Sequence, residues 1–268
     1  MRAPVIIFVA LVIAAAAAPV LAPYNPERID LVTRREAPSA AHPFGTDELG
    51  RDVFSRVVYG ARVSLAVGLF SAAVAGASGV AVGAIAGYAG GAIDAALMRA
   101  TDGMLAIPRL PLLMIAAAVL QPSIPMLIVL VGLAGWMETA RVVRAEFRSL
   151  GATGFVESAR ASGASHARVL LRHLLPNAAP AVAVSVTLAV ARGILLESAL
   201  SFFGVGVRPP AASWGNMLYQ AQSTLASEPW LAIAPGAFIV LTTVSVSLIG
   251  DRLSAPTDPY RVVPTNSA

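Results

Sequence analysis

The chain has 268 residues, of which 57% are hydrophobic and only 13% are charged, and such a composition excludes an ordinary soluble domain. It predicts a protein that crosses a membrane several times, and the apolar runs described below make the expected fold all-α. All 19 basic residues are arginine, against 15 acidic residues, which indicates arginine-rich cytoplasmic loops rather than nucleic-acid binding, and the lack of cysteine excludes disulfides and thiolate-bound metals.

The first predicted element is the apolar run from Val5 to Ala22, which follows Arg2. Its length is near the minimum that crosses the hydrocarbon core of a bilayer. A cleaved signal peptide is the alternative, because residues 20–22 resemble a small-residue cleavage site. Pro23 directly after Ala22 disfavours cleavage there, so we expect an uncleaved first transmembrane helix.

Residues 24–62 are polar and proline-bearing, and we expect them to lie outside the bilayer. Thr46 can cap a helix whose first turn holds Asp47 and Glu48. An apolar stripe at helical spacing follows and indicates a helix that lies in the membrane interface before the next span. The stripe consists of Leu49, Val53, Phe54, Val57 and Val58. Residues 1–62 therefore form a first transmembrane helix with an external segment, and the other spans lie in residues 63–268.

The same external region contains Gly45, Thr46, Asp47, Gly50, Arg51 and Asp52. These residues resemble the Gly-Thr-Asp-x-x-Gly-Arg-Asp signature before the second span of certain binding-protein-dependent ABC transporter permeases. That branch is the second permease subunit of importers for dipeptides, oligopeptides, nickel and glutathione. The resemblance implies a multi-pass inner-membrane protein of the type I importer permease fold, with six transmembrane helices and a cytoplasmic coupling helix. The alternative for the charged residues of this set is a group of surface ion pairs.

Val63 to Tyr88 is predicted as the second span, and glycines at every fourth position suit close helix packing there. A short polar connection, residues 90–103, follows. Met104 to Trp136 is compatible with one long helix or with two spans. The positive-inside rule favours one span, whereas the turn signal at residues 121–125 favours two, Met104–Leu120 and Ser123–Val142. We expect two, because of this turn and because the resemblance implies six spans.

Residues 145–176 are predicted to form a loop outside the bilayer. Glu157 lies in the first turn of a short helix that begins near Thr153 or Gly154, and Gly163 breaks this helix. Ser165 can cap a second helix, and Pro176 is expected to stop or redirect it.

This loop resembles the Glu-Ala-Ala loop of the same permeases. The matching residues are Glu157, Ala159, Gly163, Leu175 and Pro176, with Ser158 in place of one alanine and His173 at an aliphatic position. The resemblance implies that residues 157–176 form the coupling helix that fits the ATPase subunit. The alternative is a solvated, basic loop between two spans.

Asn177 to Val205 is the next predicted span, and it contains Arg192 and Glu197. Charges within a span are costly and are by default functional. These two side chains point about 140° apart around the helix, so we expect each to face a partner helix or a water-filled path. A buried ion pair or a snorkelling arginine is the alternative.

The segment that follows, residues 197–217, again resembles the same permease branch, and Pro209 and Pro210 predict irregular backbone at the outer face. Trp230 to Gly250 is the last predicted span, and Pro235 is expected to kink it. A short, poorly ordered tail after Arg252 is expected at the inner surface.

The chain has no lysine and so cannot contain a phosphate-binding Gly-x-x-x-x-Gly-Lys loop, and we do not expect an enzyme. No cofactor is expected, and the three histidines lack the spacing of a metal site. The resemblance implies a homologous permease, two cytoplasmic ATP-binding subunits that hydrolyse ATP and an extracytoplasmic solute-binding protein as partners. Peptides, or a related small solute such as nickel or glutathione, are the implied cargo. A stand-alone secondary carrier and a non-transporting scaffold are the alternatives.

Overall fold

The structure, a computed structural model, describes residues 2–254, and the expected tail falls mostly in residues 255–268, outside the described residues. Within residues 2–254 the only β-pairing is an isolated antiparallel bridge between Thr46 and Asp52. All other regular structure there is helical. The all-α prediction is confirmed.

Twelve α-helices and three short 3-10 or π segments make up the described chain. The α-helices are α1 (Arg2–Ala16), α2 (Ala18–Leu21), α3 (Val53–Ala89), α4 (Gly91–Ala106), α5 (Arg109–Leu120), α6 (Ile124–Leu133), α7 (Trp136–Gly151), α8 (Gly154–Ala161), α9 (His166–Arg168), α10 (Leu175–Phe202), α11 (Trp214–Ala221) and α12 (Trp230–Ser254). Leu31–Thr33 and Gln222–Thr224 are 3-10 turns, and Val169–Leu174 is a π-helical turn between α9 and α10.

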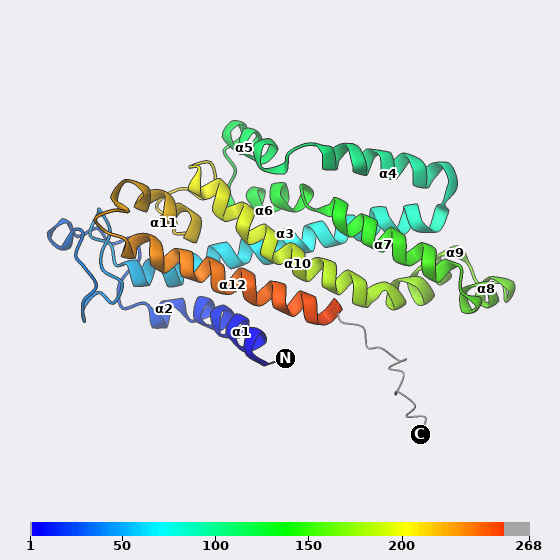
Figure 1. Ribbon diagram of the computed structural model, residues 1–268, viewed down its shortest axis with the longest axis horizontal. Coiled ribbons are helices and arrows are strands. Elements are labelled where there is room, and N and C mark those ends of the chain that lie inside the picture. The colour runs from blue at the N-terminus through cyan, green and yellow to red at the C-terminus, as the bar shows by residue number, and fades with distance from the viewer. Residues whose placement is uncertain (1, 255–268) are drawn as a thin grey trace, which may run out of the picture.

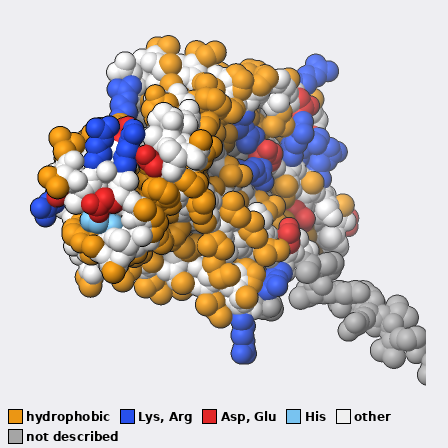
Figure 2. Space-filling model, turned by 60° about the vertical axis from the view of Figure 1, so that its left-hand side comes forward, with side chains coloured by type: hydrophobic (Ala, Val, Ile, Leu, Met, Phe, Trp, Pro, Cys, Tyr) orange, Lys and Arg blue, Asp and Glu red, His pale blue; other side chains and the backbone are white. Residues whose placement is uncertain are grey.

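Several of these helices can cross a membrane. Among residues 2–254, three continuous helices are long and apolar enough, namely Val53–Ala89, His166–Phe202 and Trp230–Ser254. Two bent pairs, α4 with α5 and α6 with α7, turn by 80° and 44° and raise the number to five if each pair is one crossing. Six crossings also require the N-terminal pair α1 and α2, of which α1 has 15 residues. The surface agrees with several membrane crossings: on the face shown in Figure 2 it is largely hydrophobic, and the charged side chains gather in a few places.

The helices form an elongated bundle around α3. Helices α7 and α10 pack along α3, and α12 packs on α10 (Figure 1). Gly83 of α3 lies so close to α7 that a Cβ there would be 2.4 Å from the carbonyl oxygen of Ala140. Glycine at this position therefore permits the approach of the two backbones, as expected for small residues at membrane helix contacts.

The two ends of the bundle differ in structure (Figure 1). One end carries a cap, residues 23–52 and 203–229, which contains α11. The opposite end carries a knuckle, residues 154–168, which contains α8 and α9. The functional sites suggested by the sequence lie at these two ends and in α10 between them.

The predicted interfacial helix is wrong. Asp52, not Thr46, caps the helix, because its Oδ2 accepts a hydrogen bond from the Ser55 N–H at 2.7 Å. From there α3 runs without a break from Val53 to Ala89, so the apolar stripe is the start of the spanning helix. Gly50 has a φ of +72° and a Cβ there would overlap the Asp30 carbonyl oxygen, so the chain turns at this residue instead of forming a helix.

Other helix boundaries also differ from expectation. Neither of the two spans predicted between residues 104 and 142 is one straight helix, because the chain bends by 80° between α4 and α5 and by 44° between α6 and α7. Residues 90–103, predicted as a polar connection, are mostly helical, because α4 begins at Gly91 and Asp94 pairs with Arg144 of α7. Pro176 does not stop its helix, which continues from His166 to Phe202. The preceding π-helical turn pairs the Leu175 N–H with the Leu170 carbonyl five residues back, and such a widened turn accommodates a proline that cannot donate. The break near Pro122 is confirmed, because α5 ends at Leu120 and α6 begins at Ile124.

Candidate functional site

The knuckle is a helix-turn-helix closed by main-chain hydrogen bonds. The Gly163 N–H donates to the Arg160 carbonyl at 3.0 Å and the Ala164 N–H donates to the Ala159 carbonyl at 3.1 Å. This pattern is a Schellman cap, and it requires the left-handed φ of +78° that Gly163 has. Ser165 then caps the next helix by accepting from the Arg168 N–H. The predicted break at Gly163 and cap at Ser165 are confirmed.

Apolar contacts hold the knuckle on the ends of the long helices. Val156, Val169 and Leu174 are fully buried and form one cluster with Val143 and Phe147 of α7. On the α3 side, the Tyr88 hydroxyl lies 2.5 Å from His166 Nδ1, and the Arg160 guanidinium lies over the Tyr88 ring. The knuckle is thus packed against both α3 and α7.

The Glu-Ser-Ala segment lies on the other side of α8. Glu157, Ser158 and Gly163 are exposed, and Ala159 is half-buried. Phe155 is also exposed to 43%. Leu175 and Pro176 are not part of the knuckle, because they begin α10. The exposed surface of α8 therefore carries the acidic side chain of Glu157 and the aromatic ring of Phe155. The opposite face of α8 is held in place by the packing of Val156.

The two intramembrane charges of α10 occupy different environments. Arg192 forms an ion pair with Glu138 of α7, and Arg109 Nη2 of α5 donates to the other oxygen of Glu138 at 2.9 Å. Glu138 and its bridging position were missed by the sequence reasoning, although a carboxylate inside an apolar run is itself a signal. Arg192 therefore pairs with a carboxylate on another helix, an arrangement that agrees with the expected partner helix and also with the alternative of an ion pair.

Glu197 is fully buried and lies apart from Arg192's ion pair. Its carboxylate accepts hydrogen bonds from Ser64 Oγ of α3 at 2.9 Å and from Ser201 Oγ at 2.7 Å. The Ser64 hydroxyl also accepts from the Trp214 N–H at the start of α11. This network ties α3, α10 and the cap together and supplies the hydrogen bonds that a fully buried carboxyl group requires.

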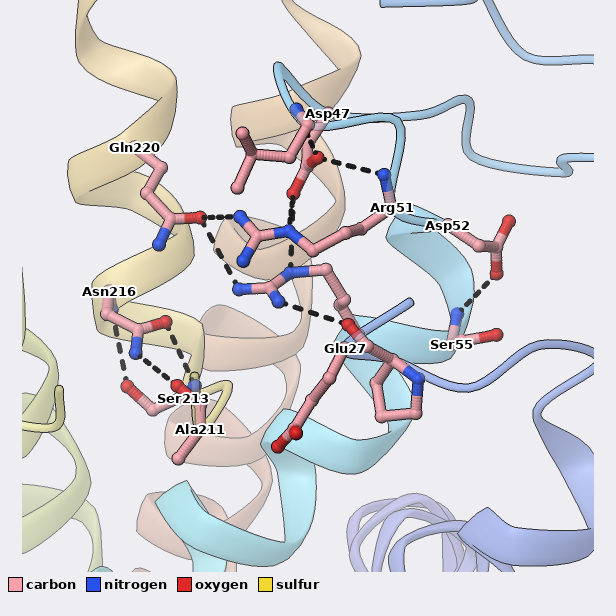
Figure 3. A network of polar contacts seen from close by, with 12 residues as sticks. Glu27, Asp47, Arg51, Asp52, Ser55, Ala211, Ser213, Asn216 and Gln220 are labelled. Carbon is pink, nitrogen blue, oxygen red and sulfur yellow. Dashed lines mark hydrogen bonds and ion pairs between the residues drawn. The ribbon is translucent and has the colours of Figure 1, made fainter. Parts of the chain in front are cut away.

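The signature residues of the cap form a buried polar network rather than surface ion pairs (Figure 3). Asp47 Oδ2 pairs with Arg51 Nε at 2.7 Å and lies 3.6 Å from Arg56 Nε. Both arginines also donate to Gln220 Oε1 of α11, at 3.0 and 3.4 Å. Arg56 is 1% exposed. The network therefore joins the turn before α3 to α11 across the cap.

The other signature residues shape the same turn. Asp52 Oδ1 lies 2.9 Å from His42 Nδ1 in addition to capping α3. The Thr46 hydroxyl accepts from the Glu36 N–H at 2.8 Å and donates to the Thr33 carbonyl. Gly45 and Gly50 both have positive φ. Arg56 and Gln220, which complete the network, were missed, because Gln220 is remote in sequence.

These features define a class of protein: a polytopic helical membrane protein with a polar-cored cap at one end and a packed helical knuckle at the other. The family of binding-protein-dependent transport system inner membrane components matches residues 79–258, and the chain belongs to this family. It is accordingly a multi-pass protein of the inner membrane with the permease fold of type I ABC importers.

Curated relatives align over most of the chain. A Brucella suis protein named as a peptide permease is 40% identical over 243 residues, which cover 90% of this chain and 80% of the relative. A Brucella abortus protein named as a peptide transport system permease is 36% identical over 96% of this chain and 87% of its own length. The dipeptide transport system permease of Alkalihalophilus pseudofirmus is 36% identical over 95% of this chain and 84% of its own length.

Proposed function

We propose that the chain is one permease subunit of an ATP-driven importer of di- or oligopeptides. The observation that carries this proposal is the similarity, over 90% or more of the chain, to proteins named as peptide or dipeptide permeases. A stand-alone secondary carrier is not favoured, because the family consists of components of binding-protein-dependent systems.

The knuckle is the proposed contact with the ATP-binding subunits. Its exposed surface offers Glu157, Ser158 and Phe155, while Val156 anchors it from behind. Close-packed apolar contacts transmit displacement rather than absorb it. A movement of the knuckle would therefore be passed to α3, α7 and α10, which line the bundle. ATP hydrolysis takes place in the two partner subunits.

The cap lies on the extracytoplasmic side in this proposal and faces the solute-binding protein. Its buried Asp47–Arg51–Arg56 network keeps that surface rigid. A second, homologous permease completes the translocation pathway. The helices change between inward-facing and outward-facing packing, and this change requires contacts that differ between the two states.

Reconstitution tests the proposal. We expect proteoliposomes that contain this chain, its partner permease, both ATP-binding subunits and the liganded binding protein to take up radiolabelled dipeptide only when ATP is present. Proteoliposomes that contain this chain alone should show uptake no greater than empty liposomes. Uptake by the chain alone, driven by an ion gradient, would establish a secondary carrier instead.

A further inference from the structure

Three charged side chains, one each from α5, α7 and α10, meet in one cluster. Arg109 of α5 and Arg192 of α10 both bind the carboxylate of Glu138 in α7. Arg192 lies about 25 Å along its helix from Leu175 and about 15 Å from Phe202, so the cluster is well inside the span. The Arg109, Glu138 and Arg192 side chains are 21%, 37% and 36% exposed. Charges exposed at this depth face water or another polar group rather than lipid.

The cluster has more donors than the described chain satisfies. A guanidinium carries five N–H donors. Among the hydrogen bonds of residues 2–254, Arg109 and Arg192 each make one, and both go to Glu138. With two arginines and one carboxylate, the cluster has a net charge of +1. It can therefore bind a further anion without losing Glu138.

The free side of the cluster opens into a groove of about 500 Å³ between the α4–α5 bend and α10. The groove walls are apolar and include Met104, Ile107, Leu110 and Leu195. A volume of this size suits a small solute. Apolar walls also weaken the screening of the arginines by water, so a bound anion would be held more strongly than at a free surface.

A second groove on the other side of the cluster has the opposite charge balance. It has about 480 Å³ and is lined by Glu138, Arg192 and, nearer the knuckle, Glu146. Two carboxylates and one arginine leave it with a net charge of −1. Of these two grooves, only the one that contains Arg109 has an excess of positive charge.

We propose that the Arg109 groove is a binding site for the C-terminal carboxylate of the peptide during its passage through the permease. This inference rests on the proposed function, because it takes the solute to be a peptide. An arginine binds a carboxylate through two parallel N–H donors. Glu138 keeps both guanidinium groups oriented when the groove is empty, and the apolar walls contact the peptide side chains.

The main competing occupant is an acidic side chain of the second permease. Such a side chain would pair with Arg109 whether or not a peptide is present, whereas the solute carboxylate would pair with it only during transport. The two occupants differ in one testable respect, which is whether the effect of losing Arg109 depends on the charge of the peptide.

The test uses the complete importer in proteoliposomes and compares a tripeptide with its C-terminal amide. In Arg109→Gln we expect ATP-dependent uptake of the free acid to fall at least tenfold, and uptake of the amide to fall less than threefold. Any preference of the binding protein for one of the two peptides is the same for the wild type and for Arg109→Gln. It therefore cancels when the acid-to-amide uptake ratio of the variant is divided by that of the wild type. Arg141→Gln, which removes an exposed arginine paired with Asp102, is the matched control and should leave the ratio unchanged.

An equal loss for both peptides, or no loss for either, would overturn the carboxylate site. ATPase activity stimulated by the binding protein verifies that each variant assembles. If the wild type does not transport the amide, a second measurement decides. The chain has no cysteine of its own, so the variant Leu195→Cys carries a single thiol in the groove wall. An anionic thiol reagent should react with this thiol several times faster than a cationic reagent of equal size. Adding Arg109→Gln to the variant should abolish this preference. Equal rates would contradict the proposal, whereas failure of the proposed function would appear as no ATP-dependent uptake of either peptide by the wild type.

Discussion

Replacing Gly163 by valine is expected to reduce ATP-dependent transport at least tenfold while the protein still inserts into the membrane. The Schellman cap of α8 holds Gly163 at a φ of +78°, which costs a β-branched residue about 1–3 kcal/mol. Apart from Gly163 itself and the two residues that flank it, no atom lies within 4 Å of a Cβ at this position. The effect would therefore come from the backbone, which must re-aim α8 and its exposed Glu157. Uptake in proteoliposomes, normalised to the amount of assembled complex, measures it.

Two substitutions serve as controls for this prediction. Gly151→Val adds the same side chain at another glycine with open surroundings but without a positive φ, so transport should remain near the wild-type level. Gly163→Asn should have an intermediate effect, because asparagine tolerates the left-handed conformation. Normal uptake by Gly163→Val would rule out a coupling role for the orientation of α8.

Charge reversal in Glu157→Lys should also prevent coupling, since it changes the proposed contact surface and opposes the helix dipole.

Replacing Asp47 by alanine is expected to destabilise the protein by about 3–5 kcal/mol. Asp47 is the acceptor for Arg51 and lies beside Arg56, whose side chain is 1% exposed. Its loss leaves two buried guanidinium groups with only Gln220 and one carbonyl as acceptors among the described residues. In detergent, the thermal unfolding midpoint should fall by roughly 10 °C or more.

Asp102→Ala is the matched control. It also removes the carboxylate of an arginine pair, but Asp102 and Arg141 are 58% and 53% exposed. Exposed pairs contribute about 0–1 kcal/mol, so the midpoint should move by no more than a few degrees. If Asp47→Ala and Asp102→Ala had the same small effect, the network in the cap would not be the element that fixes this end of the bundle.

Local features of the sequence predicted the knuckle well. A glycine break and a serine cap depend on a few neighbouring residues, and both Gly163 and Ser165 have the expected roles. The start of α3 was mispredicted because Thr46 and Asp52 are both good caps, and the choice depends on the turn at Gly50. The continuation of the helix through Pro176 depends on a π-helical turn that has no clear sequence signal.

Contacts between remote residues could not be predicted. The signature Asp47 and Arg51 were identified, but Arg51 also donates a hydrogen bond to Gln220, which is 169 residues away. In the same way, Arg192 was identified as an intramembrane charge, but its partner Glu138 lies 54 residues earlier. The spacing of charges along one helix gives their directions around that helix and does not give the helix that faces them.

Labelling of a single cysteine tests the central claim most directly. The chain contains no cysteine, so Ser158→Cys places one thiol on the exposed face of α8. If the knuckle receives the ATP-binding subunits, a membrane-impermeant maleimide should label this thiol in inside-out vesicles and not in intact spheroplasts. Bound ATP-binding subunits should then protect it. Labelling from outside in intact spheroplasts, with no protection by those subunits, would contradict the account.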